Sequence, residues 1–327
     1  MKTVLLGALA AFVLTVVAGV ICVPLLRKIK AGQPILTYVK AHESKSGTPT
    51  MGGLFFILSA TAVFFAFKGY EESVAVMAIA FGLFYMLIGF LDDFIKVRYG
   101  KNEGLKPYQK IFFQTAVSVV AGFYAYRNGL TFFYIPFVKK TVDIGAFIVP
   151  FAIFTMIAVT NSVNLTDGLD GLAGGACLCY FLCFIALSAA ENALFGYDLL
   201  RDGQWEKLRL LSACLAGATA GFLVFNVSKA AVFMGDTGSL SLGGFIGAIS
   251  IFSGNGLFIP IIGVTFVISC ASVIIQVAHF KRTRRRIFLM APLHHHFQMK
   301  GKTEAQISYF YSLITVITGT ICVIFYL

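Results

Sequence analysis

The sequence predicts an all-α, polytopic membrane protein that forms one integral membrane domain over residues 1–327. Hydrophobic residues make up 58% of the chain and charged residues only 13%, whereas soluble domains are nearer half apolar and a quarter charged. Apolar runs of about 20 residues recur along the chain, which is the length that a helix needs to cross a bilayer. A β-barrel would instead show short segments of alternating polarity, and the sequence lacks them.

Ten apolar runs are expected to form transmembrane helices. Lys2 before the first run resembles the start of a signal peptide, but no small-residue cleavage site follows, so this run is kept as a helix. The third run is expected to end at Asp92, residues 127–146 to form a short β-hairpin, and the polar stretch 191–209 around Trp205 to form a surface helix. The expected helices cover about 4–23, 53–67, 74–91, 111–125, 147–163, 172–190, 210–227, 239–253, 257–279 and 307–327.

The positive charges define an orientation in the membrane. Most of the 26 Lys and Arg residues lie in the loops after the first, third and ninth expected helices. Positive residues mark the cytosolic side, so we expect the loops after the odd-numbered helices to face the cytosol and both termini to lie outside. The formal net charge of +11 therefore reflects membrane orientation, and no nucleic-acid partner is expected.

The unusual polar residues all fall on the expected cytosolic side, so we interpret them as one site. Clustered carboxylates repel one another and favour a cation, and oxygen ligands suit Mg²⁺ rather than zinc. Nearby lysines suit phosphate groups, and the adjacent glycines let the backbone approach a ligand closely. In the alternative reading, the acids end helices at the water boundary and the glycines form tight turns. The group comprises Asp92, Asp93, Asp167, Asp170, Asp236, Asn164, Lys45, Lys96, Lys110 and the histidines at 294–296.

The remaining reactive residues leave several interpretations open. All seven cysteines lie in apolar runs, where small packing residues are expected, and no disulfide framework is indicated. The consecutive histidines 294–296 are either a metal site or groups that contact a substrate, and neighbours on a regular helix cannot all face one ion. The basic run from Lys281 to Arg286 is either a contact for anionic lipids or ordinary cytosolic charge.

A cytosolic Mg²⁺ site at the bilayer surface indicates an enzyme that joins a water-soluble phosphate compound to a lipid phosphate. A transporter is the first alternative, and it predicts charges near the middle of broken helices. A structural scaffold is the second, and it predicts no effect of replacing Asp236 by Asn.

Five motifs, in chain order, resemble the phospho-N-acetylmuramoyl-pentapeptide transferases, a branch of the polyprenyl-phosphate N-acetylhexosamine-1-phosphate transferases. The Asp-Asp and Asn-x-x-Asp motifs occur across that superfamily. TPTMGG and PLHHHF are more specific to the pentapeptide branch and argue against a sister enzyme that uses UDP-GlcNAc. The motifs are HESKSGTPTMGG (42–53), GFLDDFIKV (89–97), NSVNLTDGLDGLAGG (161–175), FNVSKAAVFMGDTGSLSLGG (225–244) and MAPLHHHFQMKG (290–301).

The resemblance implies transfer of phospho-MurNAc-pentapeptide from its UDP form to undecaprenyl phosphate, giving lipid I and UMP for peptidoglycan synthesis. It also implies Mg²⁺ as cofactor, contact with membrane lipids, a homodimer and a place in the bacterial cell membrane. Three sequence positions depart from the usual pattern: the loop before His42 lacks an Arg and a Gly-Pro, Gln298 replaces a Glu, and Tyr309 replaces an Arg.

Individual roles are likewise implied by the resemblance. Asp236 would be the main Mg²⁺ ligand, while Asp92 and Asp93 would act near the lipid phosphate, with Asp92 as proton acceptor. Either the lipid phosphate attacks directly or a covalent enzyme intermediate forms. His295 is assigned to catalysis. The substrate-binding residues would be Lys45, Thr50 and Lys110 at the phosphates, Asn164, Asp167, Asp170, Asn226, Phe233 and Gly235 around the nucleotide and sugar, and His294 and His296 beside them.

Overall fold

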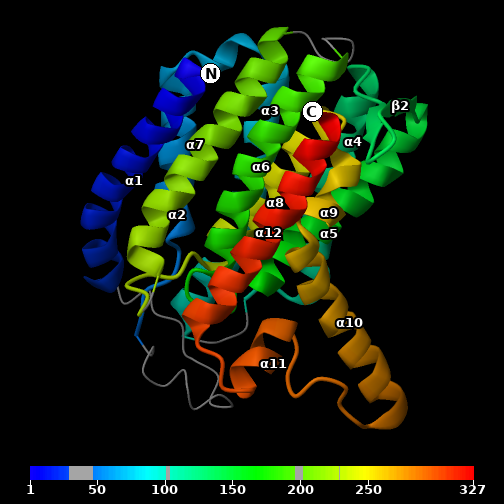
Figure 1. Ribbon diagram of the computed structural model, residues 1–327. Coiled ribbons are helices and arrows are strands. Elements are labelled where there is room, and N and C mark those ends of the chain that lie inside the picture. The colour runs from blue at the N-terminus through cyan, green and yellow to red at the C-terminus, as the bar shows by residue number, and fades with distance from the viewer. Residues whose placement is uncertain (29–46, 101–103, 196–201, 228) are drawn as a thin grey trace.

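The computed structural model describes residues 1–28, 47–100, 104–195, 202–227 and 229–327, and most of these residues are helical. Figure 1 shows a bundle of long helices, with both termini at the end of the bundle opposite α11. The elements are α1 (Lys2–Lys28), α2 (Gly53–Ala66), η2 (Gly69–Glu71), α3 (Ser73–Tyr99), α4 (Pro107–Arg127), β1 (Phe132–Ile135), β2 (Lys140–Asp143), η3 (Gly145–Phe147), α5 (Ile148–Thr166), α6 (Leu172–Phe195), α7 (Asp202–Asn226), α8 (Gly235–Phe252), η4 (Gly256–Phe258), α9 (Ile259–Ile262), α10 (Val264–Thr283), α11 (Leu293–Met299) and α12 (Glu304–Tyr326).

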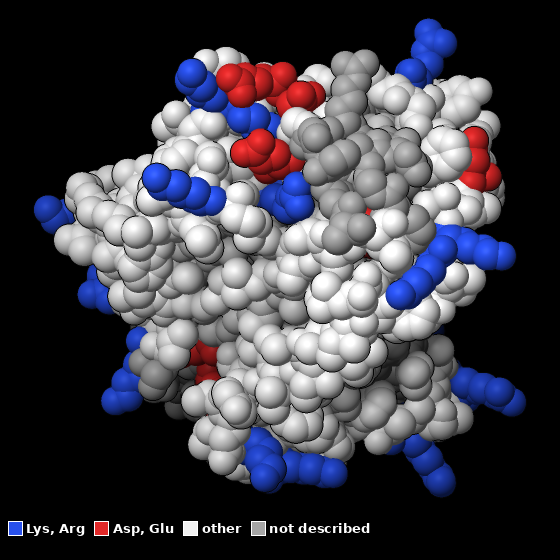
Figure 2. All heavy atoms as spheres, turned by 45° about the horizontal axis from the view of Figure 1, so that its top comes forward, with Lys and Arg blue, Asp and Glu red and all other residues white. Residues whose placement is uncertain are grey.

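Seven helices in the described part of the chain are long and apolar enough to cross a membrane, namely α1, α3, α5 with η3, α6, α7, α10 and α12. A mostly helical, multi-pass architecture is therefore confirmed. α2 is apolar but has only 14 residues, and neither α4 nor α8 belongs to the group of seven. Figure 2 shows broad surface areas without charged side chains between scattered blue and red groups, as expected where lipid covers the protein.

α8 is the central helix, and every residue from Thr237 to Phe252 is buried. α2, α3 and α5 pack around it. Small residues permit this close approach, as in membrane helix pairs generally. A Cβ at Gly243 would lie 2.5 Å from the Cα of Thr160 on α5, and a Cβ at Gly89 on α3 would overlap the backbone at Asp236. The start of α8 is therefore held directly against α3.

The expected β-hairpin is confirmed, since β1 and β2 pair antiparallel with Phe132 opposite Asp143. The expected end of the third helix at Asp92 is wrong, because α3 continues to Tyr99. Lys96 lies one turn after Asp92 and forms an ion pair with it, so the helix can continue past the acids.

The surface helix expected around Trp205 is also wrong. Trp205 lies in the first turns of α7 and is fully buried, as are Leu208 and Ser212 on the same helical face. The ninth expected helix is interrupted, because α9 ends at Ile262 and α10 begins at Val264, on either side of Gly263.

Candidate active site

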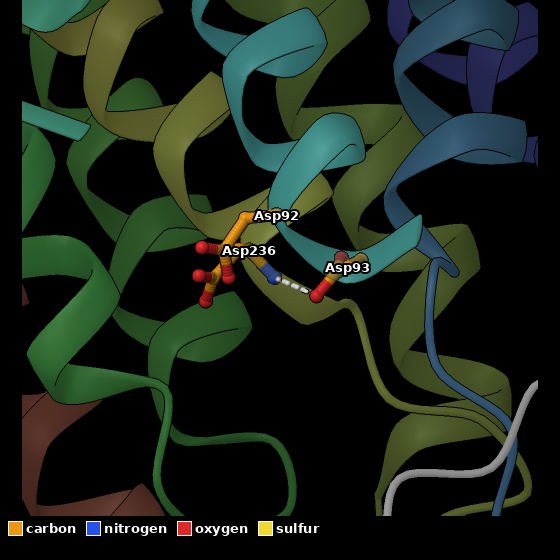
Figure 3. Close-up of side chains that lie close together, drawn as sticks. All are labelled: Asp92, Asp93 and Asp236. Atoms are coloured by element: carbon orange, nitrogen blue, oxygen red, sulfur yellow. Dashed lines mark hydrogen bonds between the residues drawn. The ribbon is translucent and has the colours of Figure 1, made fainter. Parts of the chain in front are cut away.

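Three aspartates from two helices form one cluster. Asp92 and Asp93 project from α3 and Asp236 from the first turn of α8, as Figure 3 shows. One carboxylate oxygen from each lies within 4.8 Å of the others. In the described part of the chain this is the one group of acidic, histidine or cysteine side chains close enough to hold a metal ion.

Asp93 holds the start of α8. Its carboxylate accepts hydrogen bonds from the Asp236 N–H (3.2 Å), the Thr237 N–H (2.9 Å) and the Thr237 hydroxyl (2.7 Å). The side chain is completely buried. An anionic acceptor at a helix N-terminus satisfies N–H groups that have no partner within the helix. Asp93, which belongs to α3, therefore caps the N-terminus of α8.

The Asp236 carboxylate is enclosed by cations and an amide. Lys110 Nζ on α4 lies 2.6 Å and Lys96 Nζ on α3 lies 3.2 Å from its Oδ2. Asn164 Nδ2 on α5 donates to its Oδ1 at 2.7 Å and also to the Ser239 hydroxyl at 2.8 Å. Three helices thus converge on a single carboxylate, and the structure brings Lys110, Asn164 and Asp236 together.

Asp92 is shared between two contacts. Its Oδ1 accepts the Leu105 N–H at 2.9 Å, and its Oδ2 pairs with Lys96 Nζ at 2.5 Å. Lys96 therefore bridges Asp92 and Asp236. The sequence grouped Lys96 with the site residues without giving it an individual role, although its spacing of four residues from Asp92 is the signal that could have paired the two.

Gly235 and Thr50 close the other side of the cluster. Gly235 has a φ of +70°, and a Cβ there would overlap Asp93 Oδ2 and lie 2.5 Å from Thr50 Oγ1. Thr50 is buried, and its hydroxyl has no hydrogen-bond partner among the described residues. Phe233 N–H donates to the Pro49 carbonyl at 2.8 Å, which holds the two segments side by side. Lys45 lies outside the described residues.

Asp167 and Asp170 follow α5, and the structure places these two expected site residues in different surroundings. Asp167 is partly buried, and burial together with the charges of Asp236, Asp93 and Asp170 raises the pKa of its carboxyl well above the usual value. Asp170 instead accepts the Ala230 N–H at 3.0 Å. Asn226 accepts the Gly171 N–H at 3.0 Å and donates to the Val232 carbonyl at 2.9 Å. Asp170 and Asn226 thus hold the site's framework together.

The three histidines occupy α11 in different surroundings. His294 is fully buried, with its ring 4.4 Å from that of His295, and a Cβ at Gly168 would overlap its Nε2. Burial and the neighbouring His295 lower the pKa of His294 to about 3. His295 Nδ1 contacts Gln298 Oε1 at 3.0 Å, and His296 Nδ1 accepts the Leu289 N–H at 3.1 Å. Only His294 and His295 therefore face the Asp167–Gly168 segment.

The chain was compared with known proteins. Residues 74–254 match the family model described as Glycosyl transferase family 4, and residues 45–57 match Phospho-N-acetylmuramoyl-pentapeptide-transferase signature 1. Curated relatives carry the name phospho-N-acetylmuramoyl-pentapeptide-transferase. The one from Clostridium novyi is 42% identical over 324 residues, which cover 97% of this chain and 95% of the relative. Those from Clostridioides difficile and a Thermoanaerobacter species are 40% and 38% identical, each match covering 97% of this chain and 96% of the relative. With this identity over nearly its whole length, the chain belongs to the phospho-N-acetylmuramoyl-pentapeptide transferase family.

Proposed function

We propose that the chain transfers phospho-MurNAc-pentapeptide from UDP-MurNAc-pentapeptide to undecaprenyl phosphate, giving lipid I and UMP. The observation that carries this proposal is the Asp236 carboxylate, held between Lys96, Lys110 and Asn164 beside two further carboxylates. Such a cluster provides a metal ligand and two phosphate-binding cations in one place. Family membership supplies the substrate class.

Mg²⁺ is the cofactor that fits these ligands. The donors are all carboxylate oxygens and lie within 4.8 Å of one another, which suits a hard cation. Asp93 accepts its hydrogen bonds from the start of α8, so it would remain an anchor for that helix, and Asp236 is the residue that would hold the ion. When bound, Mg²⁺ would neutralise negative charge on the phosphate oxygens of the donor.

The remaining chemistry belongs to this chain's own side chains. An oxygen of the lipid phosphate attacks the phosphorus that bears the sugar, and the bond from that phosphorus to the oxygen of the departing UMP breaks. Lys96 and Lys110 neutralise charge on the phosphates, and Asp92 accepts a proton from the lipid phosphate. Direct attack is sufficient without a covalent intermediate, because phosphoryl transfer needs mainly positioning and charge neutralisation.

The positions of the two termini support a proposal for the number of membrane crossings. Both lie at the same end of the bundle (Figure 1), which requires an even number of crossings. Seven long apolar helices are an odd number, so at least one further helix would have to cross, and we propose that α2, α4 and α8 all do, making ten. Residues 1–327 then form one integral domain of the bacterial cell membrane, with the acidic cluster on the cytosolic face, both termini outside, and assembly as a homodimer.

The test is release of UMP by detergent-purified protein given UDP-MurNAc-pentapeptide and undecaprenyl phosphate. We expect release with Mg²⁺, none with EDTA, and at least about a hundredfold loss in Asp236→Asn, because one ligand and ion-pair partner is removed. Release with UDP-GlcNAc but not with the pentapeptide donor would assign the chain to a different specificity. No release with either donor would refute the transferase proposal.

A further inference from the structure

A partly buried amide pair joins α4 to α5 one helical turn away from the residues that hold Asp236. Asn161 Nδ2 donates to Gln114 Oε1 at 2.7 Å, and Gln114 Nε2 lies 3.4 Å from Asn161 Oδ1. Gln114 is completely buried. In an apolar interior no water replaces a lost hydrogen bond, so such a pair fixes the separation of the two helices.

The spacing along each helix connects this pair to the site. Gln114 follows Lys110 by four residues and Asn161 precedes Asn164 by three, so each amide lies on the same helical face as a site residue. Lys110 and Asn164 contact the two opposite oxygens of Asp236, at 2.6 and 2.7 Å. Any change in the distance between α4 and α5 would therefore alter both contacts.

The helix that carries Asp92 joins the same network. The Tyr85 hydroxyl on α3 lies 2.8 Å from the Ser118 hydroxyl on α4 and donates to the Gln114 carbonyl at 3.3 Å. Farther along α4, away from the site, α4 and α5 approach each other closely at a glycine, since a Cβ at Gly122 would lie 3.0 Å from both the Cα and the carbonyl oxygen of Val149. The polar link thus lies at the site end of the contact between α4 and α5.

We propose that Gln114 and Asn161 are positioning residues for the transfer reaction. Their amide pair sets the distance between α4 and α5 at which Lys110 and Asn164 together orient the Asp236 carboxylate. This inference rests on the proposed transferase function, and it assigns neither residue a contact with substrate.

Gln114→Leu removes the pair and leaves a somewhat shorter, apolar side chain. We expect kcat for UMP release to fall at least about tenfold, with KM for UDP-MurNAc-pentapeptide within about threefold, since small misplacements of reacting groups reduce rates strongly. Tyr180→Phe is the matched control. It removes a buried interhelical hydrogen bond, from Tyr180 to Ser250 (2.9 Å), at the far end of α8. That variant should show a similar decrease in melting temperature with wild-type kcat.

A side-chain exchange separates geometry from packing. Gln114→Asn and Asn161→Gln should each lower kcat, whereas the double variant keeps the summed length of the pair and should recover most of it. A folded double variant with no recovery would overturn the proposal. So would Gln114→Leu with wild-type kcat and a melting temperature lowered only as in Tyr180→Phe.

A readout without substrate distinguishes failure of this inference from failure of the proposed function. In the wild type the Lys110 amine is held by Asp236, so its modification by an amine-reactive reagent, followed by mass spectrometry, should be slow. The rate should rise at least about threefold in Gln114→Leu and stay unchanged in Tyr180→Phe, as loosening of one ion pair predicts. Unchanged Lys110 reactivity in Gln114→Leu would overturn the inference, even if the wild type released no UMP.

Discussion

Asp93→Asn tests whether Asp93 stabilises α8 or acts in the chemistry. The carboxylate accepts three hydrogen bonds at the start of α8, two from backbone N–H groups and one from the Thr237 hydroxyl. An asparagine has nearly the same shape but only one acceptor oxygen. Its amide nitrogen must then face either the Asp236 N–H or the Thr237 N–H. Whichever N–H it faces loses its hydrogen bond, because the amide nitrogen is not an acceptor.

The expected magnitude follows from these contacts. One buried N–H donor left without an acceptor costs about 1–3 kcal/mol. Loss of the negative charge at the helix N-terminus costs roughly 0.3–1 kcal/mol more, and up to ~2 kcal/mol in buried geometry. The sum is about 1.3–5 kcal/mol, and with an unfolding entropy of about 2.1 cal/mol/K per residue over 327 residues it lowers the melting temperature by roughly 2–7 °C.

The assay is thermal unfolding in detergent, measured beside UMP release. Asp143→Asn is the control, because Asp143 accepts one N–H bond, from Gly145 (2.8 Å), but lies exposed on the hairpin. We expect Asp93→Asn to lose both stability and activity, and Asp143→Asn to lose neither. If Asp93→Asn kept the wild-type melting temperature while activity disappeared, Asp93 would act chemically and the assignment as a distant helix cap would be wrong.

Three other predictions follow from the same contacts. Gly235→Ala should abolish activity, since the added Cβ would overlap Asp93. Gly129 has the same φ of +70° but open space around it, so Gly129→Ala should keep activity and lose only about 1–2 kcal/mol of stability. Equal effects of the two variants on activity and stability would contradict this. Asn226→Leu should lower the melting temperature along with activity, because two buried hydrogen bonds disappear; activity lost at wild-type stability would instead indicate direct substrate contact. His294 has its pKa lowered from 6.5 to about 3, so its stabilising contribution is full above pH 6.5 and falls, by at most about 1.4 kcal/mol per pH unit, as the pH drops below it. The melting temperature of His294→Phe should therefore vary less than that of the wild type between pH 7 and 5, and parallel curves would refute this.

Several features could be predicted because their cause is local. Apolar runs, turn residues and the hairpin pattern depend on neighbouring residues, so most helices and the hairpin were located within a few positions. The end of the third helix was misplaced because Lys96 offsets the charge of Asp92 within the helix, and a hydropathy pattern does not register such pairing. Trp205 was misplaced because the stretch around it reads as polar, although one of its helical faces is buried against the bundle.

The sequence by itself determined a mostly helical chain with several segments long and apolar enough to cross a membrane, and its motifs identified the family. Only the tertiary structure decided what each polar group contacts. It distinguished Asp93 and Asn226, whose hydrogen bonds are used by the framework, from Asp236, on which α3, α4 and α5 converge. The physical reason is that a buried polar group must find its partner across helices, and sequence spacing does not specify which helices will be neighbours.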